Sequence, residues 1–93
     1  MIRSTKGKLI LPALDGKVRK GFPTKLLRRT RALVGALDTA VELDDLRSPP
    51  GNRLEKLTGD RKGQYALRVN DQWRICFNWT SKGPEDVELV DYH

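Results

Sequence analysis

The chain has 93 residues, a length that suffices for one domain spanning residues 1–93. Its formal net charge of +6 at pH 7 favours an anionic partner such as a nucleic acid or an acidic protein. One cysteine and one histidine exclude an intrachain disulfide and a zinc site, so we expect no metal and no cofactor. The apolar run at residues 9–14 is too short for a signal peptide and no run approaches transmembrane length, which predicts a cytoplasmic protein without membrane contact.

The first two dozen residues carry weak signals. Residues 1–5 alternate apolar and polar side chains and could form a short edge strand. Pro12 and Gly16 interrupt residues 6–21, so we expect one or two short helical pieces there.

The clearest helix is predicted after Pro23, where Thr24 can cap it, and runs to about Ala40. Its inward stripe follows the i, i+3, i+4 spacing of a helix on a sheet; it consists of Leu26, Thr30, Leu33, Val34, Leu37 and Val41. Four basic residues near the start are predicted to cover the outer surface: Lys25, Arg28, Arg29 and Arg31. Because positive charge does not stabilise a helix N-terminus, this surface is either a solvated charged face or a docking surface for a polyanion or an acidic partner.

The breaker cluster at residues 48–52 marks a change from helical to strand patterns. Four strands are predicted; they cover residues 53–58, 64–69, 72–79 and 86–90. Helices followed by such a meander indicate an α+β fold, in which two N-terminal helical segments pack on one face of a small, mainly antiparallel sheet of four to five strands. The other face of the sheet is expected to be open.

The length of the loop between the second and third predicted strands decides which side chains share a face. A two-residue loop would turn the apolar sets of the two strands to opposite faces. With a three-residue loop, Leu67 faces Ile75 and every large apolar side chain gathers on one side. The other face then carries Arg68 opposite Arg74, a pair of like charges that is destabilising unless an anion lies close by. The two guanidinium groups could instead extend into solvent or meet Glu88, and spacing leaves both interpretations open.

The predicted open face has the residue types that RNA cleavage without a metal needs. These are a base for the 2′-OH proton, an acid for the leaving oxygen and cations for the developing charge on the phosphate. The acid or base candidates are Glu55, Tyr92 and His93, and the candidate phosphate-binding cations are Arg53, Lys56, Arg61, Lys62, Arg68 and Arg74. Simpler interpretations exist: Tyr92 could cover the core, His93 could be a frayed terminus and Glu55 could pair with a neighbouring cation.

Three segments resemble the HigB branch of the RelE/ParE toxin superfamily. They are Arg53-Leu54-Glu55-Lys56-Leu57-Thr58-Gly59-Asp60-Arg61, Val69-Asn70-Asp71-Gln72-Trp73-Arg74-Ile75 and Val90-Asp91-Tyr92-His93. The resemblance implies a RelE-like fold and a type II toxin, a ribosome-dependent mRNA endonuclease (mRNA interferase) that cuts codons in the decoding site of the 70S ribosome by metal-independent 2′-OH attack. It also implies a HigA-type helix-turn-helix antitoxin as partner, with operator DNA bound only through the antitoxin complex.

The same resemblance assigns roles to four residues of the candidate site. Arg74 matches the strand arginine that stabilises the scissile phosphate. Asp91, Tyr92 and His93 match the C-terminal functional triplet, in which His93 is the general acid or base.

The chain departs from the family pattern at three positions. Glu55 and Thr58 stand where relatives often carry His and Lys, and Tyr65 stands where some relatives have His. Glu55 could still act as a general base; a toxin relative with weakened activity is the alternative. A ParE-like DNA gyrase inhibitor that acts by binding is a second alternative. A third, a non-enzymatic RNA-binding module, would need exposed stacking aromatics, whereas the predicted register turns the aromatic residues into the core.

Overall fold

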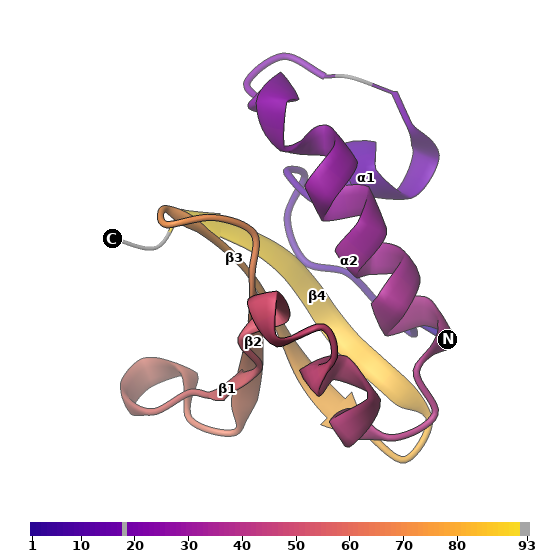
Figure 1. The fold of residues 1–93 in the computed structure, drawn as a ribbon. Helices are drawn as coiled ribbons and strands as arrows, with labels where there is room; N and C mark the ends of the chain where they lie inside the picture. The colour runs from indigo at the N-terminus through magenta and orange to yellow at the C-terminus, as the bar shows by residue number, and fades with distance from the viewer. Residues whose placement is uncertain (18, 92–93) are drawn as a thin grey trace.

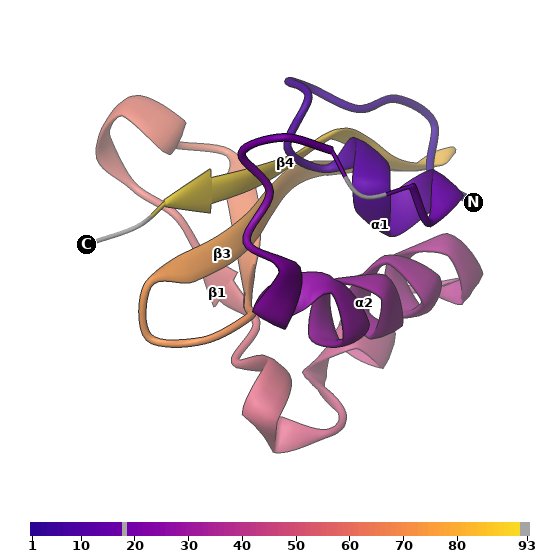
Figure 2. The same cartoon turned by 90° about the horizontal axis from the view of Figure 1, so that it is seen from above.

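The computed structural model describes residues 1–17 and 19–91. Its elements in chain order are α1 (Leu11–Asp15), the 3-10 turn η1 (Thr24–Leu26), α2 (Leu27–Thr39), the 3-10 turns η2 (Leu43–Arg47) and η3 (Pro50–Asn52), β1 (Glu55–Lys56), the 3-10 turn η4 (Gly59–Arg61), β2 (Gln64–Arg68), β3 (Trp73–Thr80) and β4 (Gly83–Asp91). The strands form an antiparallel sheet in the order β1-β2-β3-β4. Both α-helices lie on one side of it (Figures 1 and 2), which confirms the predicted α+β class. The 3-10 turns η2, η3 and η4 lie outside the predicted helices.

The short helix α1 is bounded by the residues that were expected to interrupt it. Pro12 occupies the first turn, where its missing N–H has no helical partner to lose. Gly16 ends the helix in the left-handed conformation, with φ of 76°, and its N–H donates to the Pro12 carbonyl. The proline and the glycine therefore set the two ends of one five-residue helix.

Helix α2 deviates from the prediction at both ends. Thr24 does not cap it, because the helix is entered through η1, whose N-cap is Pro23. Five of the six stripe residues are buried; they are Leu26, Thr30, Leu33, Val34 and Leu37. The sixth, Val41, is 84% exposed because Ala40 is already extended and turns the chain away from the helix.

None of the helices that the structure describes has the length and the apolar character that crossing a membrane requires.

The strands also differ in extent from the prediction. β1 is reduced to two residues, since Arg53 takes a left-handed conformation with φ of 45° before it and η4 begins soon after it. β4 starts at Gly83 rather than at residue 86, because a tight turn places Gly83 directly opposite Thr80. The third and fourth strands consequently form a longer hairpin than the sequence pattern indicates.

The predicted register of the β2–β3 hairpin is confirmed. Leu67 lies opposite Ile75 and Arg68 lies opposite Arg74, as a three-residue loop requires. Leu67, Ile75 and Phe77 are fully buried and join the α2 stripe in the main hydrophobic core. The side of the sheet that faces the helices is therefore the one that the apolar alternation indicates.

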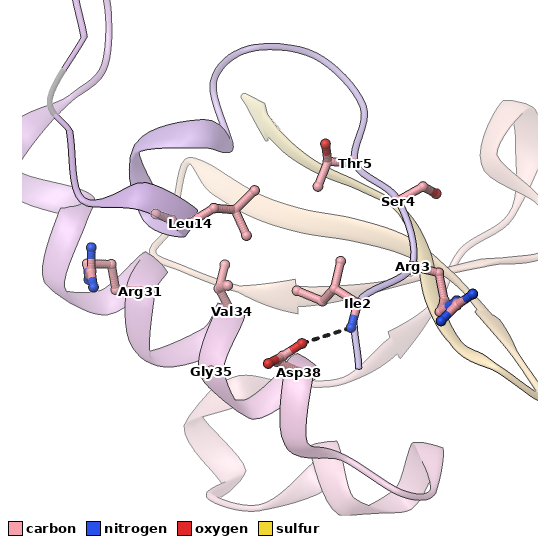
Figure 3. Close-up of a pocket in the computed structure, with 10 residues that line it drawn as sticks. Ile2, Arg3, Ser4, Thr5, Leu14, Arg31, Val34, Gly35 and Asp38 are labelled. Atoms are coloured by element: carbon pink, nitrogen blue, oxygen red, sulfur yellow. Dashed lines mark hydrogen bonds between the residues drawn. The ribbon is translucent and has the colours of Figure 1, made fainter.

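The N-terminal segment, residues 1–6, runs alongside β4 as a partial fifth strand. Thr5 forms a parallel bridge with Val87, and the Lys6 N–H donates to the Val87 carbonyl at 2.9 Å. On the helix side, the Ile2 N–H donates to Asp38 Oδ1 of α2 at 2.9 Å (Figure 3). A hollow of about 480 Å³ lies between this segment, α1 and α2 (Figure 3). The edge strand predicted at residues 1–5 is thus a bridged segment fixed at both ends.

Arg29 points inward, which corrects its predicted place on the outer surface of α2. Its Nη2 donates to the Arg68 carbonyl at 3.0 Å and to Asn52 Oδ1 at 3.3 Å. Asn52 is only 2% exposed, and its Nδ2 donates to the carbonyls of Leu46 and Ser48. This Arg29–Asn52 hub ties the helix, the 46–52 loop and the end of β2 together. The other three basic residues are exposed as predicted; they are Lys25, Arg28 and Arg31.

Candidate functional site

The face of the sheet away from the helices, called here the second face, carries two neighbouring rows of side chains. The register places Glu55, Ala66, Cys76 and Glu88 in one row across all four strands. The adjacent row across β2, β3 and β4 consists of Arg68, Arg74 and Val90. Because side chains two residues apart on a strand share a face, Glu55 and the two arginines project to the same side of the sheet.

The second face is only partly open. Leu57, which follows β1, is buried against Ala66 and Cys76, and Val90 packs at the edge of this small cluster. Leu57 continues the pairing with β2, since its N–H donates to the Gln64 carbonyl at 2.8 Å, and it projects to the same face as Glu55. The accessible part of the second face therefore lies on either side of the apolar cluster, at the arginine pair and near η4.

The turn that follows β2 supplies an acceptor for each member of the arginine pair. Arg68 forms an ion pair with Asp71, and Arg74 Nη1 donates to the Asn70 carbonyl. Asn70 Oδ1 in turn accepts the backbone N–H groups two and three residues further on, both at 2.8 Å. The anion that compensates Arg68 in this structure is thus a carboxylate of the chain itself.

Glu88, which the sequence offered as a partner for the arginine pair, is paired with a different residue. Arg61 Nη1 lies 3.2 Å from Glu88 Oε1 and also donates to Gln64 Oε1 at 3.1 Å. Both side chains of the ion pair are half-buried. The loop arginine is therefore held across the second face by β2 and β4.

Cys76 lies fully buried beneath these charged groups. Burial raises the pKa of its thiol above the ordinary value of 9.0; Glu88 acts in the same direction, whereas the Arg61 and Arg74 guanidiniums act against it. The thiol is thus protonated near neutral pH and poorly nucleophilic.

We expect alkaline pH to destabilise the protein through Cys76. The native pKa of this thiol is raised, so its contribution to stability is complete below the pKa of the unfolded thiol and is lost as pH rises through the native pKa. Urea midpoints measured between pH 7 and pH 10 check this. A Cys76→Ala variant should lose this part of the pH dependence, and an unchanged slope in the variant would refute the assignment.

The remaining predicted cations are distributed on both sides of the sheet. Lys56 lies opposite Tyr65, so it projects to the helix side rather than toward Arg74. Arg53 is exposed before β1, and Lys62 is exposed beside Arg61. The structure accordingly brings Arg61 and Lys62 to the second face and does not bring Lys56 there.

Of the predicted C-terminal triplet, the structure describes Asp91, the last residue of β4. Asp91 is opposite Trp73, and its Oδ2 accepts a hydrogen bond from Gln72 Nε2 at 3.1 Å. This register turns Asp91 to the helix side of the sheet. Tyr92 and His93 lie outside the described residues.

A second hollow on this face was missed by the sequence analysis. It has a volume of about 480 Å³ and is lined by Lys6, Asp60, Arg61, Lys62, Gln64 and Asn78. Gln64 and Asn78 are directly opposite each other on β2 and β3. The correctly predicted register already implies this pairing, so the signal for both amides was present in the sequence. The approach of Lys6 was not, because it depends on the N-terminal segment docking on β4.

Comparisons with known proteins converge on one family. A family model described as "RelE-like toxin of type II toxin-antitoxin system HigB" matches residues 13–93. The chain is 40% identical over 65 residues to Toxin HigB-1 of Vibrio cholerae, covering 70% of this chain and 68% of that protein. It is 31% identical to Endoribonuclease HigB of Proteus vulgaris over the full length of both. In the YoeB-YefM complex from Staphylococcus aureus, a chain of 15% identity superposes with a TM-score of 0.63, covering 100% of this chain and 98% of that one, which shows a shared fold.

Proposed function

Because the chain belongs to the HigB-like family of RelE-like toxins from type II toxin–antitoxin systems, we propose that it is a toxin that cleaves mRNA codons in the ribosomal decoding site. The full-length likeness to a protein named Endoribonuclease HigB supports the endoribonuclease activity. The observation that carries the proposal is the placement of Arg68 opposite Arg74 on the second face, with Glu55 on the same side of the sheet.

The reaction that fits these groups is attack by a 2′-OH on the adjacent phosphate. The 2′-OH gives its proton to a base, its oxygen bonds to phosphorus, and the bond to the 5′-oxygen of the next nucleotide breaks as that oxygen takes a proton from an acid. Arg74 stabilises the additional negative charge on the phosphate in the transition state. Glu55 is the proposed base and His93 is the proposed acid, with Tyr92 completing the site. Asp91 lies on the helix side of the sheet, so it is not proposed to contact the phosphate at Arg74.

Four further cations are proposed to hold the RNA backbone; they are Arg53, Arg61, Lys62 and Arg68. Lys56 projects to the helix side of the sheet and is not part of this proposal. Arg68 contributes when a substrate phosphate replaces Asp71 as its partner. Salt is expected to weaken the binding of RNA because each phosphate contact releases counterions.

The proposed partner is a HigA-type helix-turn-helix antitoxin, with operator DNA bound only through the toxin–antitoxin complex. Solved structures of similar fold are YoeB-YefM toxin-antitoxin complexes, which supports a protein antitoxin. A cytoplasmic location and a single domain spanning residues 1–93 complete the proposal.

Primer extension on a defined mRNA tests this function. The purified protein is incubated with the mRNA, with and without programmed 70S ribosomes. Cuts at decoding-site codons only in the presence of ribosomes are the expected result, and cuts in both reactions would remove ribosome dependence from the proposal. Intact mRNA in both reactions would contradict the proposed cleavage activity and favour a gyrase inhibitor or a toxin relative with weakened activity.

A further inference from the structure

We propose that the hollow beside η4, called here the amide hollow, is a second RNA subsite that binds a nucleotide outside the cleaved position. Its lining residues are Lys6, Asp60, Arg61, Lys62, Gln64 and Asn78. The proposal rests on the proposed function, since it takes single-stranded RNA as the ligand. It adds a specific place on the second face where the RNA is held away from Arg74.

The charges around the amide hollow favour a phosphate. Lys6 and Lys62 are both exposed, whereas Arg61 is neutralised by its ion pair with Glu88. One carboxylate, Asp60, also lines the hollow. Asp86 adds a second carboxylate at the edge of the hollow, where it accepts from Asn78 Nδ2. The two exposed lysines are therefore the groups that would contact a phosphate, each as a point charge.

The two amides of the hollow are oriented by their neighbours. Gln64 Oε1 accepts a hydrogen bond from Arg61 at 3.1 Å, which assigns its Nε2 as an available donor. Asn78 Nδ2 donates to Asp86 Oδ2 at 3.1 Å, which assigns its Oδ1 as an available acceptor. Because Gln64 and Asn78 lie directly opposite each other, the hollow offers one donor and one acceptor close together. The edges of RNA bases combine donors and acceptors in the same way.

Several elements build the amide hollow, so it does not depend on one flexible loop. The hydrogen bond from Lys6 N–H to the Val87 carbonyl places the N-terminal segment beside the hollow. Asp86, which orients Asn78, is itself fixed by its N–H bond to Ser4 Oγ at 2.8 Å. The hollow is thus bordered by the N-terminal segment, η4, β2 and β3.

The amide hollow and the arginine pair lie on the same face at a distance that one RNA strand can span. Gln64 and Arg68 are four residues apart on β2, which corresponds to about 13 Å at the usual rise of a strand. At the 3.4 Å spacing of stacked bases this is about four nucleotides, and it is fewer in an extended strand. A strand with its scissile phosphate at Arg74 therefore reaches the hollow with a nearby nucleotide.

Binding of RNA that cannot be cleaved tests the subsite separately from catalysis. The probe is a fluorescent single-stranded oligoribonucleotide with every 2′-OH methylated, measured by anisotropy. Gln64→Glu keeps the oxygen that accepts from Arg61 and loses the outward donor, and Lys62→Gln loses one exposed ammonium. Lys82→Gln, at the exposed β3–β4 turn, is the matched control because all three variants change the net charge by −1.

We expect Gln64→Glu and Lys62→Gln each to raise the Kd about three- to tenfold, and Lys82→Gln to raise it less than about twofold. Equal weakening in all three variants would show a general charge effect and would overturn the subsite. Binding of empty 70S ribosomes is the second arm: a selective loss there alone would assign the bound nucleotide to ribosomal RNA. If neither arm shows a selective loss of binding, the proposal is overturned.

The outcomes also separate this subsite from the proposed function. Site-selective loss of binding together with intact mRNA in the ribosome assay would leave the RNA subsite standing and contradict the cleavage activity. If the wild-type protein cleaves normally at decoding-site codons and both subsite variants bind as Lys82→Gln does, the cleavage activity stands and the RNA subsite is contradicted.

Discussion

Replacing Arg74 with alanine is expected to lower the rate of mRNA cleavage about 10²- to 10³-fold, the loss typical for removal of one group that stabilises transition-state charge. The free energy of unfolding should fall by about 1–3 kcal/mol, because Arg74 Nη1 donates to the carbonyls of both Asn70 and Trp73. Single-turnover cleavage on programmed ribosomes and urea unfolding measure the two quantities.

Two companion variants define what Arg74 contributes. Arg74→Lys keeps the charge and loses the planar fork, so its rate should lie between those of the wild type and Arg74→Ala. Arg68→Ala removes the neighbouring arginine, which is paired with Asp71, and should lower the rate about tenfold or less. If Arg68→Ala and Arg74→Ala lost activity equally, the specific role of Arg74 would be wrong.

Leu37→Ala is expected to destabilise the protein by about 2–5 kcal/mol, whereas Val41→Ala should change stability by less than about 0.5 kcal/mol. The helical spacing alone puts both residues in one buried stripe, but Leu37 is 0% exposed and Val41 is 84% exposed. A domain of this size has a total stability of about 5–15 kcal/mol, so the first substitution removes a large part of it.

Urea unfolding of the two variants with their m-values measures the difference. In thermal unfolding, Leu37→Ala should lower the Tm by about 8–40 °C, given about 4–8 °C per kcal/mol. A comparable loss for Val41→Ala would show that the end of α2 packs in solution as the sequence pattern indicated.

The sequence predicts the sheet register well because register depends on local features. The period-two alternation and the loop length together determine that Arg68 lies opposite Arg74. The fold class follows from the order of helical and strand patterns in the same way. Neither prediction depends on which residues distant in the sequence contact one another.

The features that the sequence analysis missed depend on long-range side-chain contacts. Arg29 has the spacing of an outward helical residue, and only the approach of Asn52 and the end of β2 draws it inward. Glu88 has Arg61 as its partner because η4 folds back over β2 and β4. No periodicity in the chain encodes such approaches. The sequence therefore predicts many of the residues that line the candidate site, but it does not predict which of them form ion pairs or hydrogen bonds with one another.

The docking of the N-terminal segment on β4 constrains the order in which the protein folds. Ser4 and Asp86, which bond to each other, are 82 positions apart in the sequence, and Lys6 reaches the amide hollow only through the same contact. Closing this loop costs conformational entropy before any contact is made, and non-local pairings of this kind slow folding. During synthesis residues 1–6 leave the ribosome long before β4 does, and they cannot dock until β4 has emerged. The amide hollow, which Lys6 lines, is therefore complete only after β4 has left the ribosome.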